Sequence, residues 1–412
     1  TAEGQFLEAA ALSRSTSNMP EICSRVCPQE RLCEGACILQ GRAEPVAIGA
    51  IERFINEYAF AHGAVDAVPP PPNGMRVAVL GSGPSGLACA DELARRGYAV
   101  TVFESQSTPG GLLVNGIPAF KLDKSVVARR VDLLKKRGVT FQLGVTVGRD
   151  VTLGDLEAKF DAVFLSLGAQ QARPLGIPGD DLQGIHHALP FLVQKNTQTP
   201  LDIPPIEVRG KRVLVLGGGD TAMDCLRTAI RCGASEALCV YRRDQANMPG
   251  SRKEYENSIE EGARFSFLTN PVRLLGDANR HVTAVRCVRM ELGAPDASGR
   301  RSPRPVRDSE FEVPADAVLI AYGFDLVPFP PGSDFDRIKH HAWGGIRVDE
   351  HQMTTVPGVF AGGDVVRGPS LVVHAVRDAR RAATEIHRYL SRRLLDELDA
   401  GQTDHLSPEI VS

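Results

Sequence analysis

The chain has 412 residues, and its 47 Lys and Arg against 50 Asp and Glu give a formal net charge of −3 at pH 7. This near balance argues against nucleic acid or an anionic membrane as the main partner. No apolar run approaches the roughly 18 residues that a membrane-spanning helix needs, and the first residues lack the features of a secretory signal. Composition and length therefore predict a cytoplasmic globular protein of two or three domains.

The first 62 residues read as helices and turns around a group of cysteines. The chain starts without Met, in what reads as the middle of an amphipathic helix, so we expect a fragment. Four of its nine cysteines lie close together in the sequence, at Cys23, Cys27, Cys33 and Cys37. Sets of thiolates bind iron–sulfur clusters or zinc. The spacing favours iron–sulfur but leaves zinc and no metal open.

A helix is predicted over 48–60, where apolar residues recur at helical spacing. The run VDAVPPPPNG (65–74) follows it. Four consecutive prolines cannot continue a helix or join a central strand, so this run predicts a stiff linker and a domain boundary. Beyond it, short β-rich runs alternate with helices, which is typical of a parallel α/β sheet.

The first β–α–β unit carries a dinucleotide fingerprint. A strand (76–80) leads into Gly81-Ser82-Gly83-Pro84-Ser85-Gly86, a helix follows over 84–96, and the next strand ends at Glu104. The glycines allow a tight turn, close approach of a pyrophosphate and close packing of helix on strand. Glu104 is predicted to accept a hydrogen bond from a ribose 2′-hydroxyl, as in FAD.

A second unit begins with KRVLVLGGGDTAMD (211–224) and returns as a strand at 236–244. Its fingerprint contains Gly217, Gly219, Asp220 and Thr221. Where an NAD site places an acid, this chain has Arg242 and Arg243. Guanidinium groups bind a 2′-phosphate that a carboxylate would repel, so the second site is predicted to prefer NADP(H). A β-meander is expected over 281–305.

Two later motifs complete the first site. GVFAGGDVV (358–366) offers two glycines and Asp364 to hold the flavin ribityl chain or a phosphate, and Gly110-Gly111-Leu112 lets the backbone lie along the flavin. A helix is predicted from about 371 to 391, before a frayed tail.

Taken together, these motifs resemble the small (β) subunits of bacterial NADPH-dependent glutamate synthase. The matching segments include PEICSRVCPQERLCEGAC (20–37), GGLLVNGIPAFKL (110–122), YRRDQANMPGS (241–251) and GVFAGGDVVRGPSLVVHAVRDARRAA (358–383). The resemblance covers nearly the whole chain. It implies an α/β fold with two Rossmann-like dinucleotide-binding domains, of the glutathione-reductase or adrenodoxin-reductase type, after a small helical iron–sulfur segment.

The resemblance also implies which residues hold the nucleotides. Relatives tend to have an aromatic residue near the flavin at the position of His374. The implied flavin contacts are Gly81, Gly83, Pro84, Gly86, Glu104, Gly111, Leu112, Gly363, Asp364, Ser370, Leu371 and Val372, and the implied NADPH contacts are Gly217, Gly219, Asp220, Thr221, Arg242 and Arg243.

In similar proteins the four cysteines help to complete two [4Fe–4S] clusters with an upstream cysteine group that this sequence lacks. Cys27, Cys33 and Cys37 are then better ligand candidates than Cys23. Glu52 matches a non-cysteine ligand of dihydropyrimidine dehydrogenase, and a solvated helix carboxylate is the alternative. The implied domains are an iron–sulfur segment (1–73), an FAD domain formed by two separate stretches (74–190 and 321–395), an NADP(H) domain between them (191–320) and a flexible tail (396–412).

The function that the resemblance implies is electron input. NADPH would deliver hydride to FAD, and electrons would pass through [4Fe–4S] clusters to the large (α) subunit of glutamate synthase, which makes glutamate from glutamine and 2-oxoglutarate. Two alternatives remain. One is the input module of a related enzyme, such as dihydropyrimidine dehydrogenase or a bifurcating ferredoxin:NADP oxidoreductase, and the other is a non-catalytic nucleotide-binding scaffold.

Overall fold

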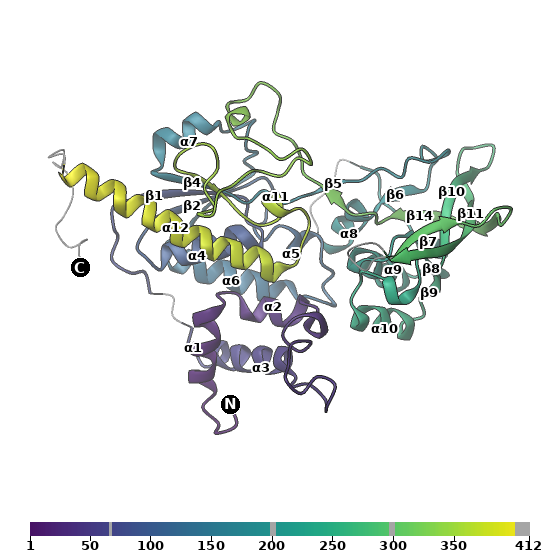
Figure 1. Cartoon of the computed structure of the whole chain (residues 1–412), viewed down its shortest axis with the longest axis horizontal. Helices are drawn as coiled ribbons and strands as arrows, with labels where there is room; N and C mark the ends of the chain where they lie inside the picture. Colours follow the sequence, from purple (N-terminus) through teal and green to yellow (C-terminus); the bar gives the residue numbers. More distant parts are fainter. Residues whose placement is uncertain (66–67, 198–202, 296–300, 400–412) are drawn as a thin grey trace. The chain divides into compact units, whose positions relative to one another are not determined.

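The computed structural model describes residues 1–65, 68–197, 203–295 and 301–399 (Figure 1). They divide into two compact units. The first contains residues 1–114 and 119–171 and the described residues from Asp325 onward, and the second contains 115–118 and 172–324. The short strands β5 (Gln171–Ala172) and β15 (Phe324–Asp325) mark two of the crossings. Among the described helices, none is both long and apolar enough to cross a membrane.

The first unit is built on a parallel five-stranded sheet with the order β16-β4-β1-β2-β3. In the central strand, Leu80 aligns with Phe103 on one side and Leu165 on the other. β1 and β4 are apolar and almost wholly buried, as expected for strands covered on both faces. The strands are β1 (Arg76–Leu80), β2 (Ala99–Glu104), β3 (Thr140–Leu143), β4 (Ala162–Leu165) and β16 (Val359–Ala361).

Helices α4 (Pro84–Ala94), α6 (Lys124–Lys136) and α12 (Val372–Asp399) lie on one face of this sheet, and α7 (Leu153–Lys159) lies on the other (Figure 1). α6 begins where the Asp123 carboxylate accepts the Ser125 N–H at 2.8 Å. α12 runs to Asp399, beyond the end predicted at 391, so the first residues of the predicted tail are helical. The rest of that tail lies outside the described residues.

The cysteine segment consists of α1 (Phe6–Thr16), α2 (Pro20–Val26), the 3₁₀ turn η1 (Gln29–Arg31) and α3 (Ile48–Ala61). α3 agrees with the helix predicted over 48–60, whereas α1 begins only at Phe6. The Asn18 side chain donates to the Ala88 carbonyl of α4 at 2.8 Å. The segment therefore packs within the first unit, although a proline-rich run follows it; residues 66–67 of that run lie outside the described residues.

The second unit has its own parallel sheet, with the order β6-β14-β7-β8-β9. Its first strand pairs with β14, and the residues from Ala172 to Phe324 belong to this unit. The domain bounds that the sequence suggests stay a prediction. The strands are β6 (Ile185–His187), β7 (Arg212–Leu216), β8 (Glu236–Val240), β9 (Arg264–Ser266) and β14 (Ala317–Ile320).

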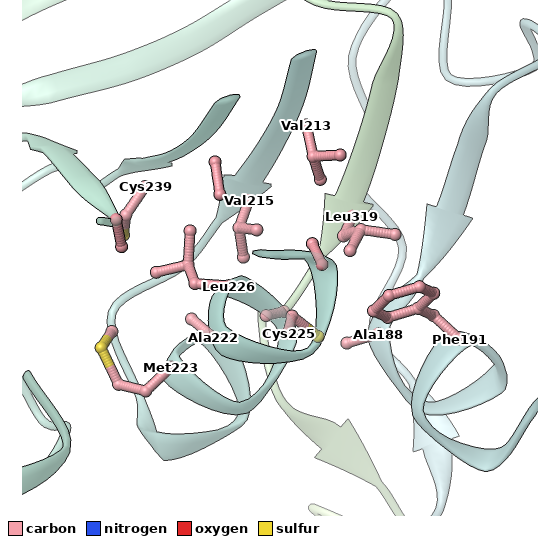
Figure 2. Packing of buried hydrophobic residues seen from close by; sticks show 14 of the residues in the cluster. Ala188, Phe191, Val213, Val215, Ala222, Met223, Cys225, Leu226, Cys239 and Leu319 are labelled. Carbon is pink, nitrogen blue, oxygen red and sulfur yellow. The ribbon is translucent and has the colours of Figure 1, made fainter. Parts of the chain in front are cut away.

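Both faces of this second sheet are covered. On one face α8 (Ala188–Asn196) and α9 (Asp220–Arg231) bury Phe191 and Leu226 against Val215 and Leu319 (Figure 2), and α10 (Arg252–Glu260) packs on α9. On the other lies an antiparallel sheet in the region of the predicted meander. It consists of β10 (Thr269–Gly276), β11 (Val282–Pro295), β12 (Arg301–Pro305) and β13 (Phe311–Pro314).

Candidate dinucleotide and iron–sulfur sites

The first fingerprint loop follows β1, the strand at which the strand order of its sheet reverses, where open α/β sheets bind ligands. Gly81 has φ +97°, and a Cβ there would lie 2.5 Å from the Ser166 carbonyl oxygen. A Cβ at Gly86 would lie 1.9 Å from the Gly81 oxygen. At Gly83, by contrast, a Cβ would meet no atom within 4 Å, so this glycine borders open space at the start of α4. A pyrophosphate fits that place.

The other predicted flavin segments converge on this loop. The Gly110 N–H donates to Ser82 Oγ at 2.9 Å. A Cβ at Gly111 would lie 2.9 Å from Gly83 Cα, and one at Gly363 would lie 2.9 Å from Ser85 Cβ. Three segments far apart in the sequence thus form one cradle within the first unit.

Glu104 ends β2 and is buried beside this cradle. Its Oε2 accepts from the Ser82 N–H at 3.0 Å and the Ser82 hydroxyl at 2.5 Å, and its Oε1 accepts from the Gln106 N–H at 2.8 Å. The carboxylate therefore also holds the loop in shape, a role that the sequence did not reveal. Its contact with a ribose stays a prediction.

Asp364 begins the short helix α11 (Asp364–Arg367) beside the same cradle. Burial raises the pKa of Asp364 to about 6. Its Oδ1 accepts the Ser370 N–H at 3.1 Å, and the Ser370 hydroxyl lies 2.8 Å from His374 Nδ1. The predicted contacts Leu371 and Val372 lie beside Ser370, at the start of α12.

The second fingerprint loop repeats this geometry after β7, again the strand where the order reverses. Gly217 has φ +136°, and a Cβ there would lie 2.4 Å from the Ala321 oxygen, while a Cβ at Gly219 would meet open space. Asp220 and Thr221 form the first turn of α9. The loop is therefore open where a pyrophosphate would bind, like its counterpart in the first unit.

The two selector arginines differ in their surroundings. Arg242 is exposed just after β8, whereas Arg243 is buried and its Nε donates to the Arg301 carbonyl of β12 at 3.0 Å. Arg242 is thus the more accessible cation for a 2′-phosphate, and Arg243 also ties β12 to the end of β8.

Residues 250–251 cover this loop as a third element. The Gly250 N–H donates to the Gly218 carbonyl at 2.8 Å, and the Ser251 N–H donates to Asp220 Oδ1 at 2.9 Å. Asp220, predicted as an NADPH contact, therefore also fixes the backbone of Ser251 beside the loop through this hydrogen bond. The available signal was Ser251 three residues before Glu254 at the start of a helix, a capping pattern.

The cysteines are only partly brought together. Cys23 is buried in α2, Cys27 follows its end, Cys33 is exposed and Cys37 is half-buried. A hydrogen bond between the Cys23 and Cys27 thiols raises the pKa of Cys23 and lowers that of Cys27. Across residues 1–65, 68–197, 203–295 and 301–399, no three His, Cys, Asp or Glu side chains gather as around one metal ion. The ligand set therefore stays a prediction.

Glu52 lies on α3, half-buried rather than fully solvated. Burial raises its pKa to about 7, and its Oε1 accepts from the Ser13 hydroxyl at 3.4 Å. Its charge also acts on Cys23 and Cys27, so it lies near the cysteine helix. Its role as an oxygen ligand stays a prediction.

Comparison with known proteins agrees with this architecture. Residues 75–379 match the family model for pyridine nucleotide-disulphide oxidoreductases, and residues 1–64 match dihydropyrimidine dehydrogenase domain II, 4Fe-4S cluster. The structure resembles that of Mycobacterium tuberculosis FprA in complex with NADPH, with a TM-score of 0.67 at 23% identity, over 82% of this chain and 88% of that one. The chain is a pyridine nucleotide-disulphide oxidoreductase in fold and class.

Two relatives narrow the assignment. Glutamate synthase [NADPH] small chain of Escherichia coli (strain K12) is 46% identical over 94% of this chain and 84% of its own length. The protein AegA of the same organism is 47% identical over 94% of this chain, but the chain spans only 60% of AegA. The chain belongs to the family of NADPH-dependent glutamate synthase small chains. The predicted resemblance and fold class are confirmed, and so, for this family, are an oxidoreductase activity and FAD, NADP(H) and [4Fe–4S] as cofactors.

Proposed function

We propose that this chain is an electron-input subunit that takes hydride from NADPH and passes electrons to the large subunit of a glutamate synthase. The observation that carries the proposal is the pair of open glycine loops, each after the strand where its sheet order reverses, with different selectors beside them. Glu104 lies beside the first loop, and Arg242 follows the strand next to the second. This difference supports two different dinucleotides.

The residues of each unit would bind and place their nucleotide. The open side of Gly83 and the N–H groups at the start of α4 would hold the FAD pyrophosphate. Gly219 and α9 would do the same for NADPH, with Arg242 on its 2′-phosphate. When bound, FAD supplies the chemistry of accepting two electrons together and releasing them one at a time. The chain's own contribution is orientation and the exclusion of water.

The NADPH site gives the first prediction. Replacing Arg242 with Ala removes a charge-assisted hydrogen bond to the 2′-phosphate, which contributes about 1.5–3 kcal/mol. We expect kcat/KM for NADPH to fall roughly 10- to 150-fold while kcat/KM for NADH stays nearly unchanged. Steady-state reduction of ferricyanide with each nucleotide measures both values.

The matched control is Arg264→Gln. Arg264 starts β9, the strand next to β8, where it aligns with Leu238, four residues before Arg242, and it forms an exposed ion pair with Glu236. This variant should resemble the wild type with both nucleotides. Equal losses for NADPH and NADH in Arg242→Ala would contradict a 2′-phosphate contact at this residue.

The remaining elements of the proposal concern the cluster and the partner. Cys23, Cys27, Cys33, Cys37 and Glu52 are proposed as [4Fe–4S] ligands, supported by the match of residues 1–64 to a 4Fe-4S domain. The large (α) chain of glutamate synthase is the proposed acceptor, supported by the small-chain relatives. A cytoplasmic location belongs to the same proposal. All nine cysteines are free thiols, which supports it.

A second candidate is the input module of a different flavo-iron–sulfur oxidoreductase. The similarity to AegA favours this candidate, because AegA contains a region similar to this chain within a longer protein, of which the chain spans 60%. The proteins that copurify with the chain discriminate the two candidates. A large chain with glutamine amidotransferase activity supports the glutamate synthase assignment.

A further inference from the structure

We propose that Ser370 and His374 form a proton relay that connects the flavin cradle with solvent. This inference rests on the proposed function and adds a role for His374. The Ser370 Oγ and His374 Nδ1 atoms are 2.8 Å apart, one helical turn from each other at the start of α12. The Ser370 N–H is fixed on the Asp364 carboxylate beside the cradle.

The need for such a relay follows from the balance of the proposed reaction. NADPH gives up a hydride, which amounts to two electrons and one proton. A one-electron acceptor, such as a cluster or ferricyanide, takes only the electrons. One proton per NADPH must therefore pass from the flavin to solvent, and hydrogen-bonded groups that titrate near neutral pH carry protons efficiently.

The arrangement of the pair suits this transfer. With Nδ1 unprotonated, the Ser370 hydroxyl donates to it, so Ser370 can take a proton on Oγ while it passes its own to the ring. His374 then releases a proton from Nε2. Its side chain is half-buried, with access to water, while the Ser370 side chain is exposed.

The charges around His374 keep its imidazole able to accept a proton. Burial and the neighbouring Arg367 and Arg377 lower the pKa of His374, and Asp378 acts in the opposite direction. Both hydrogen bonds from the Arg367 guanidinium to Asp378 are 2.6 Å long, so those two charges are largely paired. Asp364 is the other titratable group next to Ser370. These surroundings favour the neutral imidazole, which is the form that accepts a proton.

The test uses the FAD-loaded full chain, reduced anaerobically with NADPH and then reoxidised by ferricyanide in a stopped-flow instrument. We expect His374→Ala to slow reoxidation about 10²-fold at pH 7.5, within the range of general acid–base effects. Added imidazole should restore most of this rate. Ser370→Ala should also slow reoxidation, but added imidazole should not rescue this variant, because it still has His374.

A second measurement does not depend on turnover. The midpoint potential of the bound flavin is followed against pH in wild type, His374→Gln and His387→Gln. If His374 takes up one extra proton when the flavin is reduced, the equilibrium constant for reduction changes tenfold per pH unit. For two electrons this shifts the midpoint potential by about 30 mV per pH unit. In the wild type, the plot of midpoint potential against pH should contain a segment that is steeper by this amount. In His374→Gln this steep segment should be absent. His387 is an exposed histidine on the same helix, paired with Tyr98, so its variant should keep the segment.

The outcomes separate the two proposals. If NADPH does not reduce the bound flavin in the wild type, the proposed function fails. If it does, but His374→Ala reoxidises at the wild-type rate and His374→Gln keeps the steep segment, the relay alone is overturned. A slow variant that imidazole does not rescue, with an unchanged potential profile, also overturns it, because His374 would then be structural.

Discussion

Replacing Arg130 with Met is expected to lower the free energy of unfolding by about 3–5 kcal/mol, because it leaves the buried Glu21 carboxylate without its counter-charge. Arg130 on α6 and Glu21 on α2 have no exposed side-chain surface, and the Arg130 Nε donates to Glu21 Oε1 at 2.7 Å. Asp91 on α4 lies 4.0 Å from the same guanidinium and also pairs with Arg137. Burial lowers the pKa of Arg130, but Glu21 and Asp91 more than offset this and hold it charged.

Arg129 provides the matched control within the same helix. It pairs with Glu57 at 2.6 Å on a partly exposed surface and lies over the Phe60 ring at 3.8 Å. Arg129→Met should lower the free energy of unfolding by only about 1–2 kcal/mol. Urea denaturation monitored by circular dichroism compares the two variants. The double variant Glu21→Met with Arg130→Met should be more stable than Arg130→Met alone, since it removes both charges of the pair. Equal losses at Arg129 and Arg130 would contradict this account.

This ion network also has a place in the proposed function. It joins α2, which carries Cys23, to α4, the helix of the first fingerprint. Arg130→Met should therefore loosen the cysteine segment more than the sheet. We expect limited proteolysis of this variant to cleave first within residues 1–65, before the parallel sheet is attacked.

The second large effect is expected at Gly83. Gly83→Ala should fold like the wild type, because its Cβ meets no atom of the chain and its φ of −67° suits any residue. The methyl group would occupy the space assigned to the pyrophosphate. Crowding of this kind costs about 1–3 kcal/mol, so we expect FAD to bind about 5- to 150-fold more weakly. Fluorescence titration of the flavin-free protein with FAD measures this.

Gly86→Ala serves as the comparison. Its Cβ would lie 1.9 Å from a backbone oxygen, so this variant should lose stability as well as FAD. Gly83→Ala that binds FAD like the wild type would show that the open space at this loop is not the pyrophosphate site.

The fold could be predicted from the sequence because its signals are local. Each fingerprint combines a strand, glycines at fixed spacing and a helix, and the carboxyl ends of parallel strands meet at one edge. The convergence of Gly83, Gly111 and Gly363 follows from that rule. Arg130 shows a subtler signal, since it shares a helical stripe with Val126, Val127, Leu133 and Leu134, all buried. The adjacent residue, Arg129, is also an arginine, but it lies off this stripe and is partly exposed.

What the sequence did not reveal depends on long-range contacts. Gly250 and Ser251 cover the second loop through hydrogen bonds to residues about 30 positions away. Arg243 is buried because β12 passes beside it, which no local pattern indicates. The cysteine spacing likewise does not determine how the thiols are arranged.

The most direct test of the central claim is an anaerobic titration of the FAD-loaded chain with NADPH, followed by absorbance and EPR, alone and with a glutamate synthase large chain. We expect NADPH to bleach the flavin absorbance, NADH to do so far less efficiently, and the added large chain to draw the electrons off. A chain that holds FAD yet keeps its oxidised spectrum in excess NADPH would contradict the assignment as an electron-input subunit.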